Sequence, residues 1–170
     1  MSKIFKISGN FTQKGEWIKP DPSFTGKIVV DDANAFYGYC NEIYDSHMPK
    51  VNKTRFLVGA FAPNGKDGKL GIAFYKISND LDQAPLMYVV PDLDDTENGS
   101  WAVLYPFIIF AHFTQQGKAK ITVEEVIYSK DKANRIKSRF EKLDRSIPYA
   151  DQLLSQEQQQ RCIDALTNAK

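Results

Sequence analysis

The sequence predicts a mainly β protein, in which an antiparallel meander of about eight strands is followed by one or two C-terminal helices. Short runs rich in β-branched and aromatic residues recur along the chain, and polar turns with Gly, Asn, Asp or Pro separate them. The apolar period changes from two to three or four only after residue 129. Closing such a meander fully or nearly into a barrel would remove its exposed edges. A bent sheet with helices packed on one face is the structural alternative.

A β-hairpin is predicted over residues 54–77, and it is the centre of the expected sheet. Two apolar runs, 54–62 and 69–77, flank a loop that holds Asn-Gly and Asp-Gly pairs. These pairs tolerate the positive φ of hairpin turns, and Pro63 removes a donor where pairing should stop. Neither run alternates cleanly between apolar and polar residues, so we expect both faces of the hairpin to be covered.

The other predicted strands follow from period-two patterns and short apolar runs. They cover residues 5–12, 24–31, 35–44, 86–90, 101–110 and 119–128. Residues 35–44 fit a strand or a helix, and their aromatic content favours a strand. That strand places Phe36, Cys40 and Glu42 on one face and Tyr37 and Tyr39 on the other. A turn is predicted at residues 115–118.

Two helices are predicted after the strands, at residues 130–145 and 155–168. Ser129 is the expected N-cap of the first helix. Its apolar stripe recurs every three or four residues and consists of Ala133, Ile136, Phe140 and Leu143. Ser155 and Gln158 resemble a capping box at the start of the second helix. The first helix also carries an excess of Lys and Arg, which suits phosphate or the acidic face of a partner, although such residues are usually just the solvated side of a helix.

Length and composition indicate one domain over residues 1–170, with the barrel at 3–128. The 22 basic and 21 acidic residues give a net charge of +1, so no nucleic acid is expected as a partner, and polyanion binding would need a local basic patch. The N-terminal residues lack an apolar leader, which predicts a cytoplasmic location. The longest apolar run, 101–113, is too short to cross a bilayer, so no membrane partner is expected.

The predicted architecture resembles the calycin superfamily of lipocalins and fatty-acid-binding proteins. Gly15-Glu16-Trp17 has the G-x-W form that lipocalins carry on their opening strand, and the helix from Lys130 follows the last strand as the lipocalin helix does. The resemblance covers the strand order over roughly residues 3 to 145. It implies an eight-stranded calycin-like barrel and assigns no functional residue.

The candidate ligand-binding residues are two carboxylates and a group of tyrosines. Glu42 shares a predicted strand face with Phe36 and Cys40, where burial would raise its pKa toward neutrality. Glu125 lies on the same predicted face as Ile121 and is the second candidate. Tyrosines supply aromatic surface with a polar tip, which suits a small aromatic or amphipathic ligand. The tyrosine candidates are Tyr37, Tyr39, Tyr75, Tyr88 and Tyr105.

No motif in the sequence indicates a cofactor or a metal, and no catalytic residue is assigned. His47 and His112 are too few for a structural zinc site. Residues 92–99 lack the ligand spacing of an EF-hand loop, and residues 65–69 lack the spacing of a phosphate loop. Cys40 and Cys162 are expected to be small buried hydrophobic residues without a disulfide.

Three functions therefore stay open, and the sequence does not decide whether the protein is an enzyme. The first is binding of a small, partly apolar or aromatic molecule in a barrel cavity of a few hundred Å³. The second is acid–base catalysis without a cofactor, of the isomerase or decarboxylase type, which requires an inward carboxyl near a tyrosine or histidine. The third is a protein-interaction module that uses the sheet face or the basic helix. The oligomeric state and the ligand are not predicted.

Overall fold

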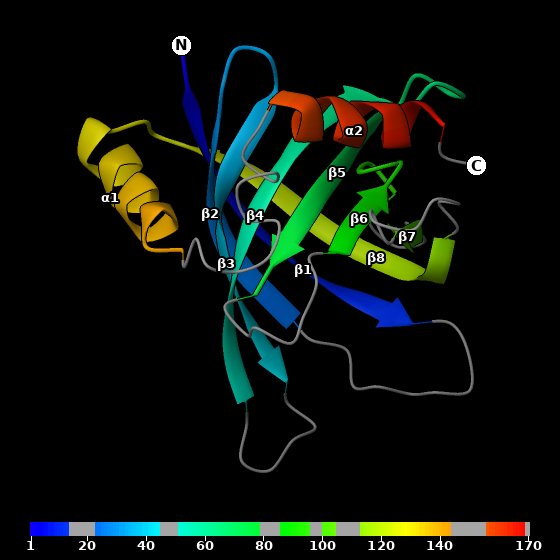
Figure 1. Cartoon of the computed structure of the whole chain (residues 1–170), viewed down its shortest axis with the longest axis horizontal. Helices are drawn as coiled ribbons and strands as arrows, with labels where there is room; N and C mark the ends of the chain where they lie inside the picture. The colour runs from blue at the N-terminus through cyan, green and yellow to red at the C-terminus, as the bar shows by residue number, and fades with distance from the viewer. Residues whose placement is uncertain are drawn as a thin grey trace.

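The computed structural model describes residues 1–13, 23–44, 51–78, 86–95, 100–104, 113–143 and 156–168. Its strands precede its two helices along the chain (Figure 1). The strands are β1 (Lys3–Gln13), β2 (Ser23–Val30), β3 (Ala35–Tyr44), β4 (Val51–Pro63), β5 (Leu70–Ile77), β6 (Leu86–Val90), β7 (Ser100–Leu104) and β8 (Phe113–Val126). The helices are α1 (Lys130–Glu141) and α2 (Gln156–Thr167). Neither helix of these described segments combines the length and the apolarity needed to cross a membrane.

The strands form one curled, barrel-like antiparallel sheet. Each strand pairs with the next in the chain, and β1 pairs with β8 as well as with β2. The β1–β8 ladder runs from Ile4 opposite Val126 to Gln13 opposite Gly117. The prediction of a mainly β, antiparallel, barrel-like fold with C-terminal helices is therefore confirmed.

Strand alternation gives the sheet two apolar faces. The inner face holds a cluster of buried residues, which includes Ile7, Phe11, Phe24, Ile28, Phe36, Cys40, Leu57, Phe61, Ile72, Phe74 and Tyr88. The outer faces of β4, β5 and β6 are also buried, because α2 and the end of α1 pack on them. This double burial explains why the hairpin sequence does not alternate cleanly.

Four glycines allow the first four strands to curl. Gly9, Gly26, Gly38 and Gly59 lie on β1 to β4, and each is displaced by two residues from the register partner of the previous one. A Cβ atom on any of them would lie closer than 3.0 Å to backbone atoms of a neighbouring strand. A glycine line of this kind bends a sheet strongly, and it is a local reason for the barrel-like shape.

The β4–β5 hairpin forms where the sequence predicts it. β4 ends at Pro63, and the Asn64 side-chain oxygen accepts hydrogen bonds from the backbone N–H groups of Lys66 and Asp67. Gly68 has a φ of 68°, as the turn chemistry requires. The side-chain amide of Asn64 donates to the carbonyl of Pro91, which ties this turn to the end of β6.

The helix α1 covers the outer face of β2 and β3, beside them in Figure 1. The Ser129 hydroxyl accepts a hydrogen bond from the N–H of Lys132, so the predicted N-cap is confirmed. The predicted stripe is also buried: Ala133 and Ile136 pack with Ile4 and Val29 of the sheet, and Phe140 packs with the outer face of β4 and β5. The helix lies across the sheet because this stripe matches an apolar row on the strands.

Some predicted boundaries are wrong. The turn expected at residues 115–118 lies within β8, because Gly117 and Lys118 pair with both β1 and β7 and thereby satisfy their backbone groups. Helix α1 ends at Glu141 with Lys142 as its C-cap, earlier than the expected residue 145. Ser155 and the Gly15-Glu16-Trp17 motif lie outside the described residues.

Candidate binding site at the Glu42 end of the sheet

Three charged side chains meet inside the curled sheet. Glu42, Arg55 and Lys76 come from the adjacent strands β3, β4 and β5, and each is in phase with inward apolar residues of its strand. Arg55 lies opposite Cys40 in the β3–β4 register, and Lys76 lies opposite Leu57 in the β4–β5 register. Strand pairing thus brings together residues that are 13 and 34 positions from Glu42.

Glu42 is the centre of this group. Its Oε1 accepts a hydrogen bond from Lys76 Nζ at 2.7 Å, and its Oε2 accepts one from Arg55 Nε at 3.0 Å. The Tyr44 hydroxyl donates to the same Oε2 at 2.9 Å, and Arg55 Nη1 donates to the Ser78 hydroxyl. The Glu42 and Arg55 side chains are 2% and 6% exposed, and that of Lys76 is 14% exposed. We call these five residues the Glu42 cluster.

Glu42, Arg55 and Lys76 all keep their charge at neutral pH. Burial acts to raise the pKa of the Glu42 carboxyl, but Lys76 and Arg55 outweigh burial and hold the pKa below its ordinary value. Burial likewise acts to lower the pKa of Lys76, but Tyr88 and Glu42 raise it overall. The expectation of a raised Glu42 pKa is therefore wrong, because sequence reasoning did not include the two cations.

An aromatic group adjoins the charges. The rings of Phe74 and Tyr88 are stacked at 5.5 Å, and those of Phe11 and Phe24 are stacked at 5.3 Å. Phe11 and Tyr88 are 5.4 Å apart, so the two pairs form one layer. Lys76 Nζ lies 4.4 Å from the centre of the Tyr88 ring, in a cation–π contact.

A small cavity lies on the described part of the inner face. Phe11, Phe24, Phe74, Glu42 and Lys76 are among the residues that line it, and its volume is about 10 Å³. That volume corresponds to roughly one water molecule. This cavity is far smaller than the expected few hundred Å³, because phenylalanine side chains fill this part of the inner face.

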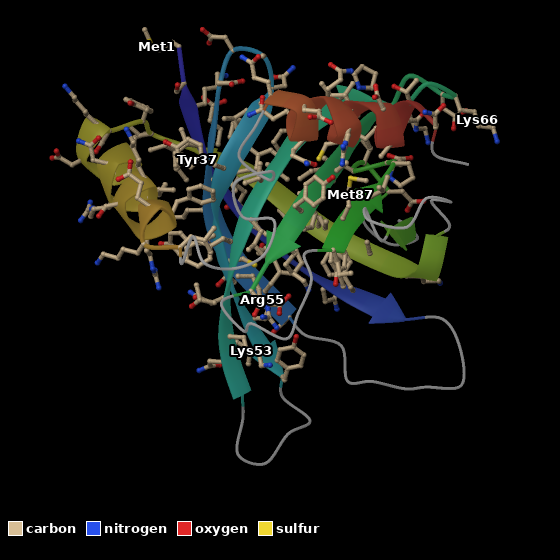
Figure 2. The ribbon with its side chains drawn as sticks, in the orientation of Figure 1. Met1, Tyr37, Lys53, Arg55, Lys66 and Met87 are labelled. Carbon is tan, nitrogen blue, oxygen red and sulfur yellow. The ribbon has the colours of Figure 1, made fainter. Side chains whose placement is uncertain are left out.

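The cluster lies toward one end of the sheet. Tyr44 is the last residue of β3, Ser78 follows the last residue of β5, and Arg55 is near the start of β4. In Figure 2, Arg55 lies in the lower part of the sheet, toward the end at which β3 and β4 project. The antiparallel order puts the ends of β1, β3, β5 and β7 on this same side.

Among the predicted binding residues that the structure describes, it brings together Glu42 and Tyr88. Tyr37, Tyr39 and Tyr75 are on the outer face, so they do not line the interior. Figure 2 shows Tyr37 between the sheet and α1, where its ring lies 5.5 Å from that of Phe140. Alternation places them there, because each has the opposite phase to the inward residues of its strand.

Glu125 and Tyr75 lie apart from the Glu42 cluster. Glu125 is exposed and accepts a hydrogen bond from Lys3 at 3.0 Å. Tyr105, His47 and His112 lie outside the described residues. Tyr75 is fully buried under α2, and burial raises the pKa of its hydroxyl to about 12.

Sequence reasoning missed Arg55, Lys76, Tyr44 and Ser78. The sequence did contain a signal for the two cations, because each interrupts an apolar strand on the face that points inward. Arg55 is on the same face of its strand as Leu57, and Lys76 is on the same face as Phe74. A long cation at such a position is either at the rim of the sheet or paired inside it.

The described residues show no group of three or more side chains that could hold a metal ion. Asp92 accepts hydrogen bonds from the backbone of Asp94 and Asp95 and from Lys69, as expected of a hydrated turn. Cys40 and Cys162 are both buried and free, which confirms the expectation for them.

Comparison of the chain with protein-family models, with curated proteins and with solved structures finds no match.

Proposed function

We propose that this protein binds a small organic anion with an apolar or aromatic part, and that its scaffold is a calycin-like closed barrel of eight strands. The ligand would enter at the Glu42 end, place its anionic group against Lys76 and Arg55, and place its apolar part against the aromatic layer. The observation that carries the proposal is the buried Glu42 cluster.

Buried charges of this kind are a poor way to stabilise a fold. Burying three charged groups carries a large desolvation cost, and apolar replacements of similar volume are often as stable or more stable. The rest of the inner face is apolar and well filled, so folding does not require charges at this place. The buried charges are better explained by a ligand whose polar group they recognise inside the sheet.

The balance of charge favours an anion. In the Glu42 cluster, two cations surround one carboxylate. The five residues of the cluster by themselves therefore carry a net charge of +1 in a region of low dielectric constant, where an incoming carboxylate or phosphate would interact strongly.

The small cavity sets a condition on the proposal. A ligand larger than one water needs room that only movement of the aromatic layer can supply. We therefore expect Phe11, Phe24, Phe74 and Tyr88 to change rotamer or position when the ligand binds, with chemical-shift changes of their ring protons.

Acid–base catalysis is the second candidate, and one contact favours it. The Tyr44 hydroxyl lies 2.9 Å from Glu42 Oε2, which meets the requirement for an inward carboxyl beside a tyrosine. It ranks below binding because the lowered pKa of Glu42 makes it a weak base near neutral pH.

The test starts with native mass spectrometry of the purified protein, which looks for a co-purified small molecule. Calorimetric titrations then compare octanoate and phenylacetate with octanol and phenylethanol, for the wild type and for Lys76→Met. Lys66→Met is the matched control, since Lys66 is exposed on the β4–β5 loop.

We expect the wild type and Lys66→Met to prefer the acids about tenfold or more, and Lys76→Met to lose this preference, because one buried charged hydrogen bond is worth about 1.5–3 kcal/mol. The proposal fails if no acid binds and the aromatic ring protons do not shift, or if Lys76→Met keeps the preference.

A further inference from the structure

We infer that the outer surface formed by β1, β2, β8 and one flank of α1 binds the phosphodiester backbone of a nucleic acid. This surface is separate from the Glu42 cluster, which lies on the inner face. The net charge of +1 gives no hint of such a surface. This surface forms because the strand register and the packing of α1 on the sheet bring its residues together.

The outer face of the sheet carries a group of exposed cations and small polar side chains. Lys27 of β2 lies opposite Lys6 of β1, and Lys120 of β8 lies opposite Asn10 of β1. The row between them contains Thr25, Ser8 and Thr122, which are paired in register across the same three strands. Strand alternation points all of these side chains away from the interior, and all of them are exposed or half-buried.

The flank of α1 that faces these side chains of the sheet carries a row of four cations. Lys132, Arg135, Arg139 and Lys142 are spaced by three, four and three residues, which places them along one side of a helix over about 15 Å. Arg139 lies 4.2 Å from the centre of the Tyr39 ring, and Tyr39 is the register neighbour of Lys27. The helical row and the lysines of the sheet therefore meet along the edge of α1.

We define the basic face as the cations of this row and of the sheet. It consists of Lys6, Lys27, Lys118, Lys120, Lys132, Arg135, Arg139 and Lys142. All eight are exposed, and none of them has an ion pair to a described residue. The adjoining carboxylates are Glu124 and Asp131. Eight of the 22 basic residues of an almost neutral chain thus lie on this one surface.

The side chains of the basic face suit a phosphate backbone better than other polyanionic surfaces. Lys, Arg, Ser, Thr and Asn are the groups that contact phosphate and sugar oxygens in nucleic-acid complexes. A membrane surface would favour exposed apolar side chains beside the cations. The large hydrophobic residues exposed in the described part are Met1, Leu70, Ile127 and Tyr128, and none of them lies within β1, β2, β8 or α1.

The mode of binding follows from the covered aromatics. Tyr37 packs on Phe140, and Tyr39 lies under Arg139, so neither ring is free for a base to stack on. The basic face therefore contacts the backbone and reads no sequence, and its affinity depends steeply on salt because bound phosphates release counterions.

The experiment measures fluorescence anisotropy of a labelled duplex of about 20 base pairs, and of one of its strands, between about 50 and 200 mM NaCl. The face variant is Lys6→Gln, Lys27→Gln and Arg135→Gln together. The matched control is Lys66→Gln, Lys69→Gln and Arg161→Gln, which removes the same charge from the β4–β5 loop and α2. Circular dichroism checks that both variants are folded.

If at least half of the basic face is engaged, the plot of log Kobs against log salt has a slope of about −4 or steeper for the wild type. The face variant should reduce that slope by about 3 and weaken binding at low salt by about tenfold or more. The control should stay within about threefold of the wild type. The inference is overturned by an absence of binding at low salt, by equal weakening in both variants, or by tighter binding of heparin or phosphatidylserine vesicles than of either nucleic acid.

Discussion

Removing the charge of Glu42 should destabilise the fold far more than an ordinary surface substitution. The Glu42→Gln variant keeps the shape of the side chain but leaves Arg55 and Lys76 without their counter-charge inside the sheet. Breaking a buried ion pair by removing one partner costs about 3–5 kcal/mol. We therefore expect the free energy of unfolding to fall by about that amount at neutral pH.

Two further variants separate the effect of an unpaired charge from the loss of a contact. Glu125→Gln removes an exposed ion pair with Lys3, for which about 0–1 kcal/mol is expected. The triple variant Glu42→Leu, Arg55→Met and Lys76→Met removes all charges together while roughly keeping volume. It should be as stable as the wild type, or more stable by up to about 1–4 kcal/mol.

Urea denaturation followed by circular dichroism measures these differences. The reasoning is refuted if Glu42→Gln lies within about 1 kcal/mol of the wild type, or if the apolar triple variant is less stable than Glu42→Gln. A stable triple variant that no longer binds octanoate would support a binding role for the cluster.

Three other predictions concern pH, thiol chemistry and the glycine line. Because the pKa of folded Glu42 lies below its ordinary value of 4.5, its stabilisation is complete above that value and is lost as pH falls through the folded pKa. The stability difference between the wild type and Glu42→Gln should therefore shrink in urea titrations from pH 5 downward, and a constant difference would contradict this. Burial raises the pKa of Cys40 and of Cys162 to about 12, so at pH 8 only about one thiol in 10,000 is ionised, and Ellman's reagent should react only after unfolding. Rapid labelling of the native protein would show that these thiols are not buried. Gly26→Ala should cost about 1–3 kcal/mol in urea denaturation, because its Cβ would collide with the β3 backbone, and a neutral result would mean that the glycine line does not shape the sheet.

The sequence alone predicted the elements whose causes are local. The β4–β5 turn depends on Asn64 and Gly68, and the start of α1 depends on Ser129, so neighbouring residues were sufficient to predict them. Alternation also separated Glu42 from Tyr37 and Tyr39 on opposite faces of β3, and applying it strictly would have removed both tyrosines from the candidate site.

Tertiary structure decided which face is the interior and which residues meet there. Tyr75 and Phe74 are both buried, because α2 covers one side of β5 and the curled sheet encloses the other, so burial patterns cannot tell the two faces apart. The turn-like residues 115–118 became part of β8 because strands on both sides satisfied their backbone.

Both proposed surfaces depend on strand pairing over long distances in the chain. Glu42, Arg55 and Lys76 form one cluster only because three strands align in a particular register. This alignment gives Glu42 a lowered pKa, where the sequence alone led us to expect a raised one. The basic face likewise needs β8 beside β1, and α1 docked on the outer face of β2 and β3. A residue type and its period are local properties, so the sequence by itself determines which side chains of a strand share a face, whereas their neighbours across the sheet are set by the fold.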